Sequence, residues 1–123
     1  MKTILLVENE EMLRNLIKEL LDIKGYAILE ATQGEAALAL ARANPGKIDL
    51  VLTDVVMPQM NGAELVECLR AEAPSLKVIF MSGNASGTNA AINKALELPG
   101  AAFMQKPFRL ADLLAQVELL LAG

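Results

Sequence analysis

Four apolar segments of this 123-residue chain each lead into polar residues that could do metal or phosphoryl chemistry. In chain order, these residues are Glu8 with Asn9, then Asp54, Ser82 and Lys106. A hydrophobic strand that runs into a loop places such a residue at the carboxyl end of the strand, the edge of an open α/β sheet where ligands bind. The sequence therefore predicts that carboxylate, amide, hydroxyl and ammonium groups meet at one edge of a sheet.

This set of groups suits phosphoryl transfer assisted by a divalent cation. A carboxylate such as Asp54 accepts a phosphoryl group only when the negative charge of both groups is neutralised. Mg²⁺ prefers oxygen ligands, which Glu8, Asn9 and Asp54 would supply. The ammonium of Lys106 would hold phosphoryl oxygens as a point charge, and the Ser82 hydroxyl can donate to the same oxygens.

Taken alone, each residue also has an ordinary structural interpretation. Glu8 and Asn9 could cap the helix that follows, because Asn is a preferred N-cap residue. Asp54 could be a solvated turn residue, Lys106 a surface lysine and Ser82 part of a plain loop. The functional interpretation is favoured because all of them occur together, in this order, at the ends of predicted strands.

Short apolar runs alternate with helical patterns about five times along the chain. Strands are expected at about Thr3–Val7, Tyr26–Glu30, Ile48–Thr53, Lys77–Met81 and Ala101–Gln105. Helices are expected at about Glu10–Lys24, Ala36–Ala43, Asn61–Glu72, Thr88–Leu98 and Leu110–Leu121. Strands separated by helices of this length form a parallel sheet with right-handed crossovers, so residues 1–123 are expected to form one three-layer α/β domain.

Helix boundaries are predicted from two kinds of signal. Two pairs of residues, Thr32 with Glu35 and Asn61 with Glu64, have the spacing of capping boxes. In a capping box, the side chain of each residue accepts a hydrogen bond from the backbone N–H of the other. Gly25 suits the C-terminal end of the first helix, because glycine adopts the left-handed conformation without strain.

Composition excludes several classes of function. The net charge is −4 and no cluster of Lys and Arg stands out, which argues against direct binding to nucleic acid. The chain has no histidine, and its one cysteine is Cys68, so a zinc site is not expected. The longest unbroken apolar run, Ala36–Ala41, is too short to cross a membrane. A single cysteine and no signal-peptide pattern at the N-terminus favour a cytoplasmic location.

Together these motifs resemble the receiver domains of two-component response regulators, and the resemblance extends over Thr3 to Leu121. It is carried by Leu6–Glu10, Asp49–Pro58, Met60–Gly62, Met81–Gly83 and Phe103–Phe108. The segments Val78–Gly83 and Leu96–Gly100 are similar to receivers of hybrid sensor histidine kinases. The resemblance implies a flavodoxin-like sandwich with strand order 2-1-3-4-5.

The resemblance also implies roles for particular residues. Asp54 would be the phosphoacceptor, with Mg²⁺ held by Glu8, Asn9, Asp54 and the backbone carbonyl of Val56. Lys106 would contact the phosphoryl group before a cis peptide bond to Pro107, while Ser82 and Phe103 would be the switch residues. The implied partners are a sensor histidine kinase or phosphotransfer protein and a downstream protein on the face of the fourth helix, fifth strand and fifth helix. The implied domain is a stand-alone regulator or a part of a larger protein.

Two alternatives to a phosphorylation-driven switch remain open at this point. Most receivers carry Asp where this chain has Asn9, so a binding module that works without phosphorylation is one of them. An Asp-nucleophile phosphohydrolase is the other, but such enzymes need a second acid two residues after the nucleophile. This chain has Val56 there, and a receiver is not itself an enzyme beyond self-catalysed phosphotransfer and slow dephosphorylation.

Overall fold

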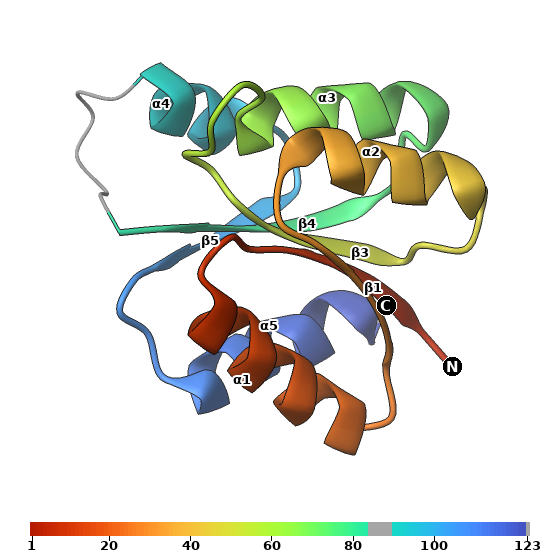
Figure 1. Ribbon diagram of the computed structural model, residues 1–123, viewed down its shortest axis with the longest axis vertical. Coiled ribbons are helices and arrows are strands. Elements are labelled where there is room, and N and C mark those ends of the chain that lie inside the picture. The colour runs from red at the N-terminus through yellow and green to blue at the C-terminus, as the bar shows by residue number, and fades with distance from the viewer. Residues whose placement is uncertain (84–89, 123) are drawn as a thin grey trace.

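The computed structural model describes residues 1–83 and 90–122 as alternating strands and helices (Figure 1). The strands are β1 (Thr3–Val7), β2 (Ala27–Ala31), β3 (Leu50–Asp54), β4 (Lys77–Ser82) and β5 (Ala101–Gln105). The helices are α1 (Glu11–Ile23), α2 (Gly34–Ala43), α3 (Gly62–Glu72), α4 (Ala90–Glu97) and α5 (Leu110–Leu121). All strand pairs are parallel and the order is β2-β1-β3-β4-β5, which confirms the predicted doubly wound sheet.

Helices cover both faces of the sheet (Figure 1). Helices α2, α3 and α4 pack on one face, and α1 and α5 pack on the other. Side chains of β1 alternate between the two cores, with Leu5 and Val7 on the first side and Ile4 and Leu6 on the second. Because the central strands are buried on both faces, they read in the sequence as unbroken apolar runs.

The two predicted capping boxes had different outcomes. Asn61 and Glu64 form theirs at the start of α3, where Asn61 Oδ1 accepts from the Glu64 N–H at 2.8 Å. The predicted box of Thr32 with Glu35 is wrong, because α2 begins at Gly34 after Gln33, which makes no side-chain cap hydrogen bond.

The first residue of α2 packs closely against a distant loop. A Cβ on Gly34 would lie 3.0 Å from the side chain of Met60 in the loop after β3. Glycine at this position therefore leaves room for Met60 beside the first turn of the helix.

β1, β5 and α5 have the predicted bounds, and the other boundaries differ from prediction by one or two residues. Strands β3 and β4 extend one residue further, to Asp54 and Ser82, and β2 lies one residue later than expected. The predicted start of the fourth helix, Thr88, lies outside the described residues, within which α4 begins at Ala90. Over the described ranges, no helix has the length and apolar character to cross a membrane.

Candidate functional site

The polar residues singled out in the sequence lie at one edge of the sheet. Glu8 directly follows β1, Asp54 ends β3, Ser82 ends β4 and Lys106 directly follows β5. The parallel topology brings these strand ends to the same side, because every crossover returns the chain to the opposite edge before the next strand. The predicted juxtaposition is therefore confirmed.

Lys106 bridges the two acidic residues at this edge. Its Nζ lies 2.5 Å from Glu8 Oε1 and 2.8 Å from Asp54 Oδ1. The Glu8 side chain is 0% exposed, that of Asp54 7% and that of Lys106 22%. The interpretations of Asp54 as a solvated turn residue and of Lys106 as a surface lysine are therefore wrong.

Glu8 is held by backbone groups as well as by Lys106. Its Oε2 accepts from the Glu10 N–H at 3.1 Å, and its carbonyl accepts from Arg14 Nη1 at 3.0 Å. The N-cap residue of α1 is Glu10, which makes no side-chain cap hydrogen bond, and Asn9 is exposed beside it. The alternative that Asn9 caps this helix is thus not supported, and its side chain is exposed to solvent.

The side chains of Glu8, Asp54 and Lys106 shift one another's pKa values. Burial, and then the neighbouring Glu8 carboxylate, raise the pKa of Asp54 to about 8, against the opposing effect of Lys106. For Glu8, burial acts to raise the pKa, but contacts with Asp54, Lys106 and the Glu10 N–H outweigh it and lower the pKa. Burial acts to lower the pKa of Lys106, yet Asp54 and Glu8 raise it. Burial therefore disfavours the ionised form of Asp54, whereas the contact between Glu8 and Lys106 favours the charged forms of both.

The loop after Asp54 is held tightly under the end of β3. The Gly62 N–H donates to the Val55 carbonyl at 2.7 Å, and Thr53 Oγ1 donates to the Asp54 carbonyl at 2.9 Å. A Cβ on Gly62 would lie only 2.2 Å from the Asp54 carbonyl oxygen. The sequence marks Gly62 as part of a motif but not the reason for it, which is this contact with the backbone of Asp54.

The residues assigned to switching lie on the β4–β5 side of the site. Ser82 is buried, and its carbonyl accepts from the Lys106 N–H at 2.7 Å. Phe103 is half-buried, pairs with Phe80 in the strand register and packs on the core beneath α2, α3 and α4. The peptide bond from Lys106 to Pro107 is cis, as the resemblance implied.

The donor set fits a hard divalent cation with few charged ligands. Within the described residues there is no group of three or more His, Cys, Asp or Glu placed to hold a metal ion. The two carboxylates of Glu8 and Asp54 and the Asn9 amide are oxygen donors of the type that Mg²⁺ prefers. Asp54 Oδ1 is buried without a hydrogen-bond partner in the described part of the chain, its contact with Nζ being an ion pair, so this oxygen has coordination capacity left.

Comparison with known proteins places this geometry in a family. Residues 4–118 match the model of the response regulator receiver domain. The chain is 39% identical over 119 residues to the sensor kinase CckA of Brucella abortus, covering 94% of this chain but 12% of that protein. It is 34% identical over 122 residues to the response regulator receiver protein CpdR of Brucella abortus, covering 98% of both chains.

A solved structure agrees with these matches. The crystal structure of the receiver domain of the hybrid histidine kinase CckA superposes with a TM-score of 0.81 at 35% identity, over 97% of this chain and 98% of that one. The strand order, the edge cluster and the match over nearly the whole sequence thus agree with one another. The chain belongs to the response regulator receiver domains of two-component signalling.

Proposed function

We propose that residues 1–123 form a phosphoacceptor domain that takes a phosphoryl group on Asp54 from a histidine kinase or phosphotransfer protein. The observation that supports this most is the buried Asp54 carboxyl, joined to Glu8 through Lys106 at the carboxyl ends of the strands. In the transfer, an oxygen of ionised Asp54 forms the new bond to phosphorus. The bond from phosphorus to the donor imidazole breaks, and its electron pair stays on the ring nitrogen.

The site residues divide this work among them. Glu8, Asn9, Asp54 and the Val56 carbonyl would hold Mg²⁺, which when bound neutralises charge on the carboxylate and on the phosphoryl oxygens. Lys106 already contacts Asp54 Oδ1 and would move to a phosphoryl oxygen once Asp54 is modified. In this way, modification of Asp54 would change the position of Lys106, the residue that follows β5.

A groove beside the site supports docking of the phosphodonor. It is lined by Met12, Leu13 and Leu16 of α1 together with Pro107 and Phe108, and it reaches Lys106. Met12 is 73% and Leu16 47% exposed, and their spacing of four residues places them on one face of α1. That face suits contact with a helix of the partner, and the groove reaches Lys106, which contacts Asp54 Oδ1.

The response is proposed to reach a downstream protein through α4, β5 and α5. Ser82 would move toward the phosphoryl group and leave space into which the half-buried Phe103 can turn. In α4, the described residues bury only Ile92 and Ala95, so its rearrangement is expected to cost less than that of α3.

One experiment separates this function from its alternatives. The protein is incubated with acetyl phosphate and Mg²⁺, and intact mass and released phosphate are followed together. A slowly decaying adduct of about 80 Da supports the switch, because phosphorylation adds one phosphoryl group. Continuous phosphate release would support a phosphohydrolase, although the exposed, apolar Val56 lies where such an enzyme needs its acid. An unchanged mass would favour a binding module independent of phosphorylation.

Asn9→Asp is expected to tighten Mg²⁺ binding. Glu8 and Asp54 are the only carboxylates of the proposed metal site, and a third charge near the cation is worth roughly 1–2 kcal/mol after desolvation, or about tenfold in affinity. Calorimetric titration with Mg²⁺ measures the change, and phosphorylation at limiting metal should become faster. Equal affinities in the two proteins would show that Asn9 is not a ligand.

A further inference from the structure

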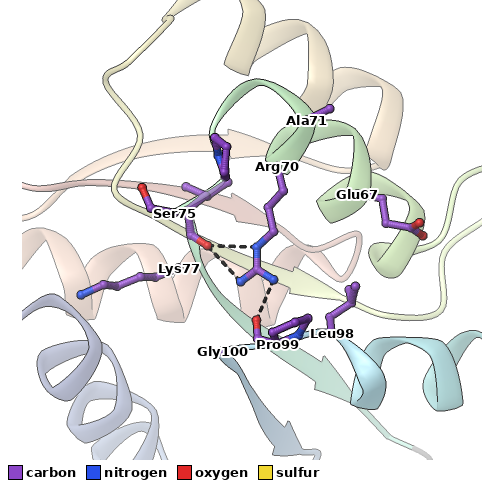
Figure 2. Close-up of a pocket in the computed structure, with 10 residues that line it drawn as sticks. Glu67, Arg70, Ala71, Ser75, Lys77, Leu98, Pro99 and Gly100 are labelled. Atoms are coloured by element: carbon purple, nitrogen blue, oxygen red, sulfur yellow. Dashed lines mark hydrogen bonds between the residues drawn. The ribbon is translucent and has the colours of Figure 1, made fainter.

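Arg70 joins two loops at the edge of the sheet opposite the phosphoacceptor. It lies in the last turns of α3, and its guanidinium crosses an open cavity of about 660 Å³ (Figure 2). Nε and Nη2 donate to the Leu76 carbonyl at 3.1 and 3.0 Å, and Nη1 donates to the Pro99 carbonyl at 2.7 Å. One side chain thus ties α3 to the residue before β4 and to the turn between α4 and β5.

The hydrogen bonds of Arg70 differ in their exposure to solvent. All three come from a permanently charged group, which strengthens them; the two to Leu76 are partly buried, whereas the one to Pro99 is exposed. Pro99 lies two residues beyond the C-terminal end of α4, where unsatisfied carbonyls favour a cation. Gly100 next to it has a φ of 69°, a left-handed conformation that glycine adopts without strain.

Two other contacts of α4 among the described residues are more easily exchanged. Lys94 Nζ lies 2.8 Å from Glu67 Oε1, but both side chains are about half exposed, and pairs of this kind contribute little. Ile92 and Ala95 pack apolar surface, which is not directional and tolerates sliding. Among the contacts of the described residues, Arg70 adds a directional attachment at the turn after α4, where Leu98 also packs on the core.

We propose that Arg70 makes the turn between α4 and β5 a fixed pivot, about which α4 rotates when Asp54 is phosphorylated. This rests on the proposed function, since it describes how that response is shaped. Lys106 at the far end of β5 and Ser82 at the far end of β4 are joined by a hydrogen bond beside Asp54. Because Arg70 holds the turn at Pro99, a displacement that starts beside Asp54 should be largest near Lys106 and Ser82 and smallest at Pro99.

The anchor itself is tested in the absence of any phosphoryl group. Hydrogen exchange is compared between wild type, Arg70→Gln and Arg70→Lys in a peptide that covers residues 95–102. We expect exchange roughly tenfold faster in Arg70→Gln, with Arg70→Lys between the two because an ammonium serves one carbonyl at a time. Arg42→Gln is the matched control: it removes the guanidinium that α2 extends toward Glu72 of α3, where the ion pair is 3.8 Å long and exposed. Equal exchange in all four proteins would overturn the anchor.

The pivot is tested by adding beryllofluoride with Mg²⁺ as a mimic of the phosphoryl group. In wild type, exchange should change in α4 before residue 95 and in β5, while residues 97–101 stay within about twofold of the free protein. In Arg70→Gln the change should spread into residues 97–101, and Arg42→Gln should behave as wild type. A wild-type response that includes this turn would overturn the pivot alone. A wild type that shows no response anywhere would overturn the proposed function, and the pivot with it.

Discussion

The Asp54→Asn variant is expected to take up no phosphoryl group from acetyl phosphate, whereas wild type gains an adduct of about 80 Da. Only a carboxylate can form the acyl phosphate, and an amide of the same shape preserves the surrounding contacts. Intact-mass measurement in Mg²⁺ gives the result directly. Labelling that persists in the variant would refute the assignment of Asp54 as the acceptor.

The same variant is expected to be more stable than wild type, and the difference should grow with pH. The pKa of Asp54 is raised from 3.8 to about 8 in the folded protein, so between these values the folded state holds a proton that the unfolded state has lost. The free energy of unfolding of wild type therefore falls as pH rises through this window. The amide that replaces the carboxyl does not titrate, so at pH 8 the variant should be more stable by at least about 1.4 kcal/mol, the value of one pKa unit.

Denaturant unfolding with a chelator present, at several pH values from about 5 to 8.5, measures this effect. Glu8 does not disturb the comparison there: its lowered pKa contributes stability that is lost only as pH falls below its usual value of 4.5. Asp22→Asn is the control, because this carboxylate pairs with Lys18 on the exposed surface of α1. Parallel pH profiles for wild type and Asp54→Asn would contradict the buried, protonated state of Asp54.

Lys106→Ala is expected to destabilise the protein strongly at alkaline pH. The change leaves Glu8 and Asp54 buried against each other without their common cation, and removing one partner of a buried pair typically costs about 3–5 kcal/mol. Protonation of Asp54 relieves part of this, so the loss should be smaller at pH 5 than at pH 8. Lys18→Ala, which breaks an exposed pair, should change stability little at either pH.

The same substitution is expected to separate labelling from switching. Asp54 remains present and can still be phosphorylated, but the group that links its modification to β5 is gone. NMR signals around Phe103 should then no longer respond to phosphorylation, at a pH and temperature where the variant is folded. A response equal to that of wild type would show that Lys106 does not couple the two.

The fold was predictable because its signals are local and repeated. Each strand is a short apolar run, each helix has its own period, and alternation of the two leaves little choice but a parallel sheet. The boundaries of β5 and α5 were predicted to the residue. The prediction failed at the start of α2, where the capping-box spacing of Thr32 and Glu35 was followed although the helix begins at Gly34 after Gln33.

The members of the site were predictable, but their electrostatics were not. Spacing alone brings Glu8, Asp54 and Lys106 to one edge of the sheet. It does not reveal that Lys106 is shared by both acids, nor that the acids are shielded from water, because burial depends on the loops packed around them. The raised pKa of Asp54 follows from that burial and so could only be found in three dimensions. Arg70 likewise has no sequence signal, since its partners are backbone carbonyls.

The contact between the Asp54 carbonyl and Gly62 gives the site a directional stiffness. A Cβ on Gly62 would lie only 2.2 Å from the Asp54 carbonyl oxygen. The end of β3 and the first turn of α3 are thus in such close contact that they have no room to move toward each other. Motion of the Asp54 carboxylate toward α3 is therefore expected to be restricted, whereas the hydrogen bond from the Lys106 N–H to the Ser82 carbonyl links the other side of the site to β5. On the proposed function, a force applied at Asp54 would be transmitted toward β4 and β5 rather than into α3, so this contact would give the signal a direction.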